Sequence, residues 1–404
     1  MKSDKNIREG YKRTTVGVIP EEWEVKKIDE LTKYYDGTHQ TPIYEEKGIP
    51  FYSVQHVTAN DFSDTKFISE EVFEKESERV VMEKGDILMT RIGDVGTAKL
   101  IDWDVKASFY VSLALIKQCD DLDSKFFEQS INGALFQRVL HKKIIHVAFP
   151  KKINLGEIGK LKLPIPPLPE QQAIANCLTT WDSGIEKLTQ LIAAKREQKK
   201  GLMQQLLTGK KRLDGFVGVW SKKKLGDFLK ESKIVSTNTD KSKRISVRLH
   251  LEGVEKRELR GTEADTTVFY KRKANQFIYG KQNFHNGAMG IIPKELDGFE
   301  TTSDIPTFDI NNKINHKWLF FFMSRYSFYK KMENRTTGTG SKRLHPKELL
   351  STLIPYPPLK EQTAIAHILT TADQEISLLE AKLAAMKEEK KGLMQVLQIG
   401  RAHV

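Results

Sequence analysis

Several turns in the first half of this chain combine basic, amide, hydroxyl and acidic side chains. They are Asp36-Gly-Thr-His-Gln-Thr-Pro42, Thr90-Arg-Ile-Gly-Asp94 and Lys151-Lys-Ile-Asn154. Arg and Lys can read guanine, Asn and Gln can read adenine, and Ser and Thr adapt to either. Lys and Arg also bind backbone phosphates. We therefore predict nucleic-acid contacts from Thr38, His39, Gln40, Arg91, Asp94, Lys151, Lys152 and Asn154.

The second half carries turns of the same character. Lys281-Gln-Asn-Phe-His-Asn286 and Thr336–Arg343 are its polar turns, and a basic strand lies nearby. The alternative interpretation is that such stretches are ordinary turns and solvated faces. For the whole set we favour DNA contact, because the turns occur at matching positions in both halves. The candidates are Arg244, Arg248, Lys281, Gln282, Asn283, His285, Asn286, Ser341, Lys342 and Arg343.

Enzymatic interpretations find little support in the sequence. Asp36 followed by Glu45-Glu46-Lys47 resembles the acids and lysine of an Mg²⁺-dependent nuclease, but a chain with 29% charged residues produces such a trio freely. His141 and His146 are a weak metal pair. The sequence has no GxxxxGK[ST], no Asn- or Asp-Pro-Pro-Tyr, no HExxH and no paired CxxC. We expect neither catalytic nor metal-binding residues here.

One sequence occurs twice and must position these turns. Residues 166–209 and 357–400 align without a gap at an offset of 191, and 25 of the 44 positions are identical. Apolar residues recur in alternating steps of three and four, which predicts coiled-coil-forming helices. Lys195, Lys199 and Lys390 occupy positions at which this pattern would place an apolar residue. The predicted helix–helix seam is Ile174, Leu178, Ile185, Leu188, Ile192, Leu202, Leu206, Ile365, Leu369, Ile376, Leu379, Leu383, Leu393 and Leu397.

Each repeat also contains a possible internal cap. Thr179-x-x-Asp182 and Thr370-x-x-Asp373 resemble capping boxes with Asp in place of Glu. They predict a short helix followed by a long one. A long portion from about Asp182 to Leu207 would measure roughly 40 Å, close to the ~34–36 Å of one turn of duplex DNA.

The segments before the repeats are globular in composition and resemble one another weakly. Trp23 and Trp220 each precede an apolar residue by five positions, and Lys84–Arg91 corresponds to Ala274–Lys281. We predict an α+β protein in which two mixed α/β domains are separated by two long helices. Packed as an antiparallel coiled coil, these helices would relate the domains by an approximate twofold axis. The predicted segments are a basic tail at 1–15, domains at 16–163 and 211–354, and helical regions at 164–210 and 355–404.

Composition favours a polyanionic partner. The 404 residues carry a formal net charge of +12, with a pI of about 9.3, which favours nucleic acid over membrane. Cys119 and Cys177 form no metal or disulfide pattern, which suits a reducing cytoplasm. No apolar run approaches the ~20 residues of a membrane span.

After Gln398 the second repeat departs from the first, and we expect its last residues to be altered.

Taken together, the chain resembles the specificity (S) subunits of type I restriction-modification enzymes. The resemblance lies in Pro-Pro-Leu-x-Glu-Gln at 166–171 and 357–362 and in Lys-Lys-Gly-Leu-Met-Gln at 199–204 and 390–395. Leu-Leu-Thr-Gly-Lys at 206–210, Asp36-Gly-Thr-His39 and Gly48-Ile-Pro50 also fit. The match is strong in the helices and weak in the globular segments, as in a family whose target recognition domains vary with their targets.

This resemblance implies a noncatalytic subunit that binds double-stranded DNA. Each domain would read one half of a split sequence, while the helices set the gap and dock two modification (methyltransferase) subunits. Restriction (motor and nuclease) subunits would join the same complex. S-adenosylmethionine, ATP and Mg²⁺ would belong to those partners, with no cofactor on this chain. A stand-alone Mg²⁺ nuclease and a purely structural coiled-coil adaptor are the two alternatives.

Overall fold

The computed structural model describes residues 7, 9–237, 240, 242–258, 267–338 and 342–400. The predicted contact at Ser341 therefore lies outside the described residues, as does the end of the chain after Gly400. The chain forms two compact units. Unit 1 comprises Met1–Leu188 and Lys382–Val404, and unit 2 comprises Thr189–Ala381. Each unit thus combines one globular segment with parts of both long helices, and each is described by itself.

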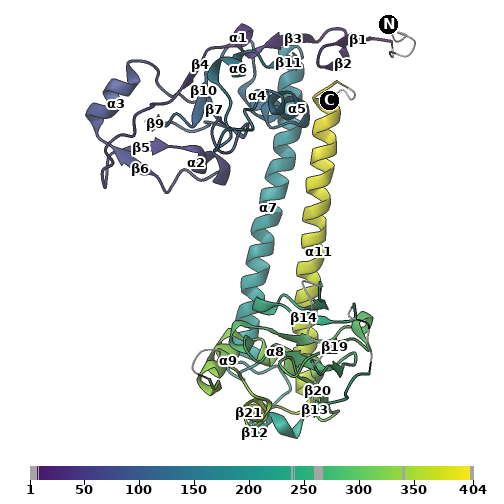
Figure 1. Cartoon of the computed structure of the whole chain (residues 1–404). Coiled ribbons are helices and arrows are strands. Elements are labelled where there is room, and N and C mark those ends of the chain that lie inside the picture. Colours follow the sequence, from purple (N-terminus) through teal and green to yellow (C-terminus); the bar gives the residue numbers. More distant parts are fainter. Residues whose placement is uncertain are drawn as a thin grey trace. The chain divides into compact units, whose positions relative to one another are not determined.

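Unit 1 is a mixed α/β body (Figure 1). Its strands are β1 (Tyr11–Thr14), β2 (Gly17–Pro20), β3 (Glu24–Lys27), β4 (Tyr34–Asp36), β5 (Ile49–Tyr52), β6 (Lys66–Ile68), β7 (Ile87–Thr90), β8 (Ala98–Leu100), β9 (Ser108–Phe109), β10 (Leu113–Ile116) and β11 (Lys162–Ile165). Its helices are α1 (Ile28–Leu31), α2 (Val54–Ala59), α3 (Glu70–Ser77), α4 (Ser124–Ile131), α5 (Ala134–His141), α6 (Leu155–Gly159), the first part of α7 (Leu168–Leu206) and the last part of α11 (Leu359–Leu397).

Unit 2 repeats much of this plan. Its strands are β12 (Ser221–Lys224), β13 (Leu229–Ser232), β14 (Ile245–Val247), β15 (Val254–Lys256), β16 (Tyr270–Lys271), β17 (Phe277–Tyr279), β18 (Met289–Ile291), β19 (Glu300–Thr301), β20 (Thr307–Ile310) and β21 (Leu353–Tyr356). Its α-helices are α8 (His316–Met323), α9 (Tyr326–Lys331), α10 (Pro346–Leu350) and the first part of α11 (Leu359–Leu397). Its 3₁₀ helices are η1 (Leu225–Asp227), η2 (Leu249–Leu251), η3 (Phe284–Asn286), η4 (Lys294–Leu296) and η5 (Met332–Arg335).

A four-stranded antiparallel sheet lies at the centre of each unit, with the same strand order in both. The order is β4-β10-β7-β8 in unit 1 and β13-β20-β17-β18 in unit 2. Every residue of β7, β10 and β17 is buried, because these inner strands are apolar on both faces. The predicted correspondence of Lys84–Arg91 with Ala274–Lys281 is confirmed, since β7 and β17 occupy the same place in the two sheets. Duplication therefore extends from the helices into the globular segments.

Smaller sheets complete the two units. In each unit the strand before the long helix pairs antiparallel with a strand near the start of the globular segment, β11 with β3 and β21 with β12. Unit 1 also has the β1–β2 hairpin and a three-stranded sheet in the order β6-β5-β9. Unit 2 instead has the pairs β14–β15 and β16–β19. The parts that differ are thus peripheral to the shared sheet.

The long helices enter the core of each unit together. In unit 1, Ile174 and Leu178 near the start of α7 pack in one cluster with Leu397 near the end of α11. In unit 2, Ile365 and Leu369 near the start of α11 pack with Leu206 near the end of α7. The two helices therefore run antiparallel within each unit, as predicted. The seam residues Ile174, Leu178, Leu188, Ile192, Leu206, Ile365, Leu369, Ile376 and Leu397 are buried, and Ile185, Leu202, Leu379, Leu383 and Leu393 are half-buried.

The predicted break inside each repeat is wrong. Helices α7 and α11 are each continuous over 39 residues. In unit 1, Lys390 Nζ lies 2.5 Å from Asp182 Oδ1, so this carboxylate binds the facing helix instead of capping its own. In unit 2, Asp373 forms the equivalent ion pair with Lys199. The lysines that interrupt the apolar pattern thus meet acidic residues across the seam.

The stretches Lys125–Lys142 and Lys317–Met332, which have a helical sequence pattern, are each divided into separate helices, α4 and α5 in unit 1 and α8 and α9 in unit 2. In unit 1 the division falls between α4 and α5, where Gly133 packs against the Gln398 side chain. A Cβ at Gly133 would lie 1.9 Å from Gln398 Oε1, so the chain turns where α11 approaches. Gln398 Nε2 also donates to the Gln129 carbonyl at 2.7 Å, which fixes the end of α11 in unit 1.

Candidate nucleic-acid interface

The three predicted turns of unit 1 meet around Arg91. This residue directly follows β7, and its backbone carbonyl accepts a hydrogen bond from Ile153 N at 3.0 Å. Its guanidinium Nη1 donates to Asp36 Oδ2 and to the Val111 carbonyl, both at 3.2 Å. The turns beginning at residues 36, 90 and 151 are therefore one assembled surface region, although they are spread over more than a hundred residues of chain.

Arg91 itself faces inward. Only 8% of the residue is exposed, and its side chain donates to internal acceptors. Asp94 is exposed but accepts a hydrogen bond from Thr90 Oγ1 at 2.9 Å, which closes the turn after β7. We therefore infer that Arg91 and Asp94 hold the turns in position. The sequence prediction did not separate such buried cations from exposed ones.

The Asp36 carboxylate is the acceptor at the centre of this arrangement. Arg79 forms an ion pair with one carboxylate oxygen, while Arg91 Nη1 and His39 Nε2 lie 3.2 and 2.9 Å from the other. Burial alone would raise the pKa of Asp36, but the bonds from Arg79 and His39 outweigh it and lower the pKa below its usual range. Gly37 is needed beside it, because a Cβ there would lie 2.1 Å from the Phe109 carbonyl oxygen.

These contacts bear on the nuclease alternative. Two guanidinium groups already neutralise Asp36, and Glu45 instead pairs through its backbone with Phe67. Within the described part of the chain, no three His, Cys, Asp or Glu residues gather as a possible metal site. The rings of His141 and His146 are in tilted contact with centroids 4.4 Å apart, and His146 Nε2 lies 2.9 Å from the His141 carbonyl oxygen. The structure does not bring the nuclease-like residues together.

The outward-facing members of the unit 1 set are mainly polar and basic. His39, Gln40, Lys151, Lys152 and Asn154 are exposed, and Thr38 is half-buried. The ammonium groups of Lys151 and Lys152 form no ion pair or hydrogen bond with any residue that the structure describes. Two neighbouring unpaired cations are available to phosphate or base atoms.

The turns of unit 2 are joined in the same manner. Lys281 follows β17, and its carbonyl accepts a hydrogen bond from Leu344 N at 2.8 Å. The Lys281 backbone N–H donates to the Asp304 carbonyl at 2.9 Å, and Arg343 Nη2 lies 3.6 Å from Asp304 Oδ2. Thr337 and Arg343 exchange backbone hydrogen bonds at 3.0 and 2.9 Å and so close the second loop.

The basic residues of the two units occupy equivalent positions. Ile153 binds the carbonyl after β7, and Leu344, which is 191 residues later, binds the carbonyl after β17. Lys151 and Lys152 therefore correspond to Lys342 and Arg343. This equivalence is stronger than a shared composition, because in both units the residue that follows the pair donates a backbone hydrogen bond to a residue just after the central strand.

The remaining predicted residues of unit 2 differ in exposure and pairing. Lys342 Nζ lies 3.2 Å from Glu333 Oε1. The ammonium groups of Lys330 and Lys342 lower the pKa of Glu333 to about 2. Gln282 is exposed, Asn283, His285 and Asn286 are half-buried, and Asn286 Nδ2 donates to Asn283 Oδ1 at 3.3 Å.

The two arginines of the basic strand differ in their exposure. Arg248 is exposed and pairs with Glu255 at 2.6 Å, and its hairpin reaches η3 through a bond from Leu251 N to the Gly287 carbonyl. Arg244 is buried, forms an ion pair with Glu300 and lies 3.7 Å from the Phe269 ring centroid. Arg244 thus stabilises the interior of unit 2, and its predicted place among the outward DNA contacts is not supported by this burial.

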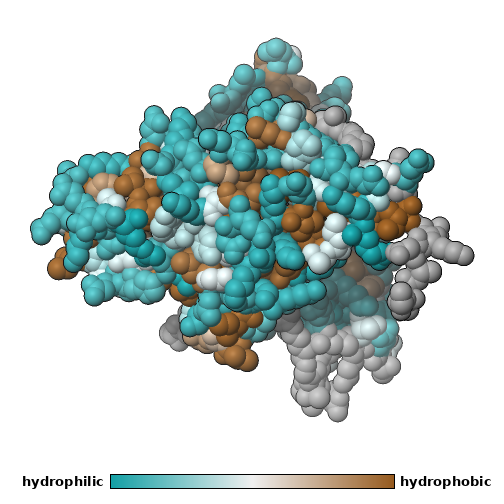
Figure 2. All heavy atoms as spheres, turned by 90° about the horizontal axis from the view of Figure 1, so that it is seen from above, coloured by the Kyte–Doolittle hydropathy of each residue, from teal (hydrophilic) through white to brown (hydrophobic). Residues whose placement is uncertain are grey.

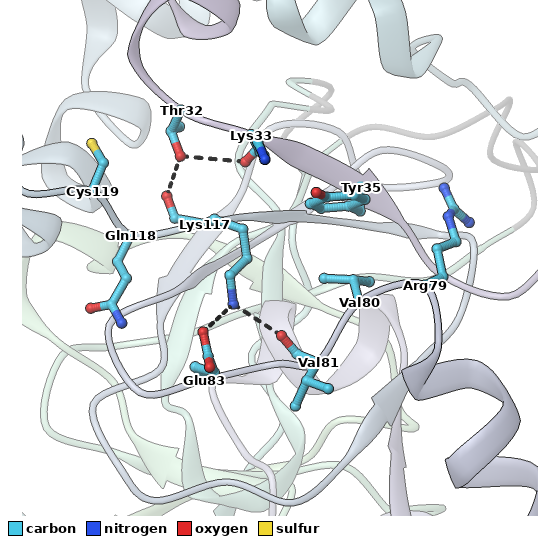
Figure 3. A pocket seen from close by; sticks show the side chains of 10 residues that line it. All are labelled: Thr32, Lys33, Tyr35, Arg79, Val80, Val81, Glu83, Lys117, Gln118 and Cys119. Carbon is cyan, nitrogen blue, oxygen red and sulfur yellow. Dashed lines mark hydrogen bonds and ion pairs between the residues drawn. The ribbon is translucent and has the colours of Figure 1, made fainter.

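A hollow of about 540 Å³ lies beside Arg79 on unit 1 (Figure 3). Tyr35, Arg79 and Lys117 line it, but both cations are already paired. Burial alone would lower the pKa of Lys117, but its bonds to Asp86 and Glu83 outweigh this and raise it. An anion would therefore compete with internal carboxylates here, and the loop around Lys151, whose two ammonium groups have no described partner, offers the better phosphate contacts.

Sequence reasoning missed the residues that bind the globular segments to the helices. Trp23 Nε1 donates to Glu170 Oε2 at 2.9 Å, and Trp220 Nε1 donates to Glu361 Oε2 at 3.0 Å. The signal was present, because both the Trp and the Glu recur in the two halves. Arg79, which holds Asp36, had no such signal because it belongs to the part of unit 1 that unit 2 does not repeat.

Comparison with known proteins agrees with this duplicated arrangement. Residues 20–196 and 219–388 match the family described as the type I restriction modification DNA specificity domain. The chain belongs to this family. It is 23% identical over 440 residues to the putative type I restriction enzyme MjaX specificity subunit of Methanocaldococcus jannaschii, covering 98% of this chain and 97% of that protein.

Solved specificity subunits have the same fold. The S subunit of the M. genitalium type I restriction-modification system superposes with a TM-score of 0.56 at 17% identity, covering 93% of this chain and 96% of that one. A chain solved for complex assembly and conformational transition of the type I R-M system gives a TM-score of 0.60 at 13% identity, with 95% and 99% covered. This chain is therefore a type I specificity subunit, noncatalytic in itself, with two target recognition domains. No helix in the described ranges has the length and apolar character to cross a membrane.

Proposed function

We propose that each target recognition domain of this specificity subunit reads one half of a split DNA sequence. The observation that carries the proposal is the equivalence of Lys151-Lys152 with Lys342-Arg343. In both units the residue that follows the pair, Ile153 or Leu344, donates a backbone hydrogen bond to a residue just after the central strand, Arg91 or Lys281. Because the side chains around these pairs differ between the units, the two domains would prefer different bases.

The repeated helices support a role in spacing and assembly. Leu168 and Leu359 occupy the same position of the two repeats, and 36% and 45% of these residues are exposed. Exposed apolar residues that recur at equivalent places suit one kind of partner binding twice. We infer that two modification subunits dock at these sites, and that restriction subunits join the assembly. Bound S-adenosylmethionine, ATP and Mg²⁺ would lie on those partners.

Methylation mapping tests whether each domain reads one half of the target sequence. A strain carrying the partner subunits is sequenced for methylated bases with this chain, without it, and with residues 211–354 replaced by the corresponding segment of another specificity subunit. The chain should add one bipartite motif, and the replacement should change one half of it while the other half stays. If both halves change together, the proposed assignment of one half-site to each domain is wrong.

A further inference from the structure

The loop between α5 and α6 of unit 1 exposes apolar side chains at its tip. Phe149 and Val147 are 104% and 96% exposed, so neither packs against the rest of unit 1. The loop is nevertheless ordered at its base, where Ile145 N donates to the Lys152 carbonyl at 2.8 Å. Ile144, just before this closure, packs on the main core of unit 1. An anchored loop therefore projects a phenylalanine into solvent.

Basic residues surround this tip on both sides. Lys142 precedes it, and Lys151 and Lys152 follow it. None of these three ammonium groups has an ion-pair partner within the ranges that the structure describes. Lys143 does pair, with Glu157 at 2.9 Å. Unpaired cations on both sides of an apolar tip suit duplex DNA. Its backbone is anionic, and the stacked bases inside it are apolar on their faces.

The tip is also continuous with the candidate interface. The Lys151 carbonyl accepts a hydrogen bond from Gly93 N at 2.8 Å, and Lys152 forms a bridge with Ile92. A duplex bound at Lys151 and Lys152 would therefore lie within a few residues of Phe149. On the face seen in Figure 2, hydrophobic side chains occur as small patches in a mainly hydrophilic surface. A small apolar tip of two exposed side chains among lysines fits a base step better than it fits a broad protein interface.

We propose that Phe149 inserts between two neighbouring base pairs of the half-site read by the first domain and partly unstacks them. Proteins that use such apolar wedges insert them from the minor groove, partly unstack a base step and kink the duplex toward the major groove. Lys151 and Lys152 would hold the flanking phosphates. This inference rests on the proposed function, because it assumes that this face of unit 1 binds the target.

The second domain lacks the corresponding residue. Its equivalent loop, Thr336–Arg343, has the sequence Thr-Thr-Gly-Thr-Gly-Ser-Lys-Arg and contains no apolar side chain as large as valine. The wedge would therefore deform one half-site and leave the other stacked. A preference for a flexible pyrimidine–purine step would follow at the first half-site alone, since such steps unstack at least cost.

Site-specific fluorescence tests this proposal with the full chain in complex with its modification subunits. Once methylation mapping has given the target, 2-aminopurine is placed in turn at each position of the duplex except the methylated bases, which the partner enzyme could itself extrude. Wild-type complex should raise the fluorescence several-fold at one step of the first half-site. Phe149→Ala should abolish that rise and weaken binding by roughly ten- to a hundredfold, the scale of one lost stacking contact. Phe149→Trp should retain both.

The matched control is Val219→Ala, which removes an equally exposed apolar side chain from unit 2. It should change neither fluorescence nor affinity. If wild type binds its target specifically and Phe149→Ala leaves every fluorescence signal and the affinity unchanged, the wedge does not exist. Loss of modification subunits from purified Phe149→Ala, with DNA unstacking unaltered, would overturn it in favour of a protein contact. Absence of sequence preference in the wild-type complex would instead refute the proposed function.

Discussion

Trp23 Nε1 donates a hydrogen bond to Glu170 Oε2 at 2.9 Å, and thereby ties the beginning of the first globular segment to the first turn of α7. The next residue, Gln171, accepts a bond from Asp123 N at 2.9 Å and donates to the Pro166 carbonyl at 2.9 Å. In unit 2, Trp220, Glu361 and Gln362 make the same set of contacts. The repeated Pro-Pro-Leu-x-Glu-Gln motif is therefore a clasp between helix and globular segment.

Glu361→Gln should destabilise unit 2. The Glu361 carboxylate is fully buried and accepts two bonds from Arg212, at 2.6 and 2.8 Å, besides the Trp220 bond. A neutral amide would leave the Arg212 guanidinium, only 24% exposed, without its counter-charge. We expect a loss of about 2–3 kcal/mol, less than for a fully buried pair. Hydrogen exchange should become faster in unit 2 while unit 1 keeps its protection.

The control for this prediction is the double variant Glu361→Gln with Arg212→Met. Removing both charges should cost less than removing the acid alone, because no unpaired guanidinium remains. Equal protection of unit 2 in wild type and Glu361→Gln would contradict the clasp.

The Asp182–Lys390 pair should contribute modestly and in a salt-dependent manner. Asp182 is 51% exposed and Lys390 is 18% exposed, so solvent screens much of the attraction. A double-mutant cycle with Asp182→Asn and Lys390→Met should give a coupling free energy of about 0.5–1 kcal/mol. The coupling should shrink in 1 M NaCl. The exposed Lys200–Glu197 pair on α7 supplies the control, with a coupling near zero expected.

Basic residues of the two interface loops should act differently on DNA. Lys151→Ala with Lys152→Ala should lower affinity for all sequences and reduce the slope of log K against log salt by about 1.8, the value for two lost phosphate contacts. Arg343→Ala should instead relax preference at one base position, by about 1–3 kcal/mol, if its guanidinium reads a base edge. Binding titrations at several salt concentrations measure both effects.

Lys222→Ala with Lys223→Ala is the matched control for charge. These lysines are exposed on β12 and carry none of the predicted contacts. A similar change in salt slope for both double variants would mean that net charge alone drives binding, and that the loop containing Lys151 has no special role.

Unit 1 should lose stability in acid through Asp36. Its pKa is lowered in the folded state by Arg79 and His39, against the effect of burial. A carboxyl group with a lowered folded pKa stabilises the protein above its unfolded pKa of about 4, and this stabilisation disappears as pH falls through the folded pKa. The free energy of unfolding, measured from pH 7 to pH 3, should therefore decrease once the pH drops below about 4. In Asp36→Asn the stability at pH 7 should be lower and this component of the acid-induced loss absent.

Much of the architecture could be predicted because the two halves of the chain repeat parts of one sequence pattern. The internal duplication and the apolar seam follow from residues that recur at a fixed offset, and the correspondence of β7 with β17 follows from a shared apolar run that ends in a basic residue. The internal helix break could not be predicted correctly, because Thr179-x-x-Asp182 has the pattern of a cap. Only the approach of Lys390 shows that Asp182 is used across the seam.

The sequence by itself determined which family of structures this chain adopts, since local periodicity and repetition are properties of the chain alone. Tertiary structure decided which of its many cations face outward. Arg91 and Arg244 look as suitable for DNA as Lys151 or Arg343, but Asp36 and Glu300 hold them inside. Burial depends on partners that are distant in sequence, because a guanidinium is stable in the interior only where folding brings an acid to it. The same reason explains Phe149, whose apolar side chain projects into solvent because no element in the described ranges packs over its loop.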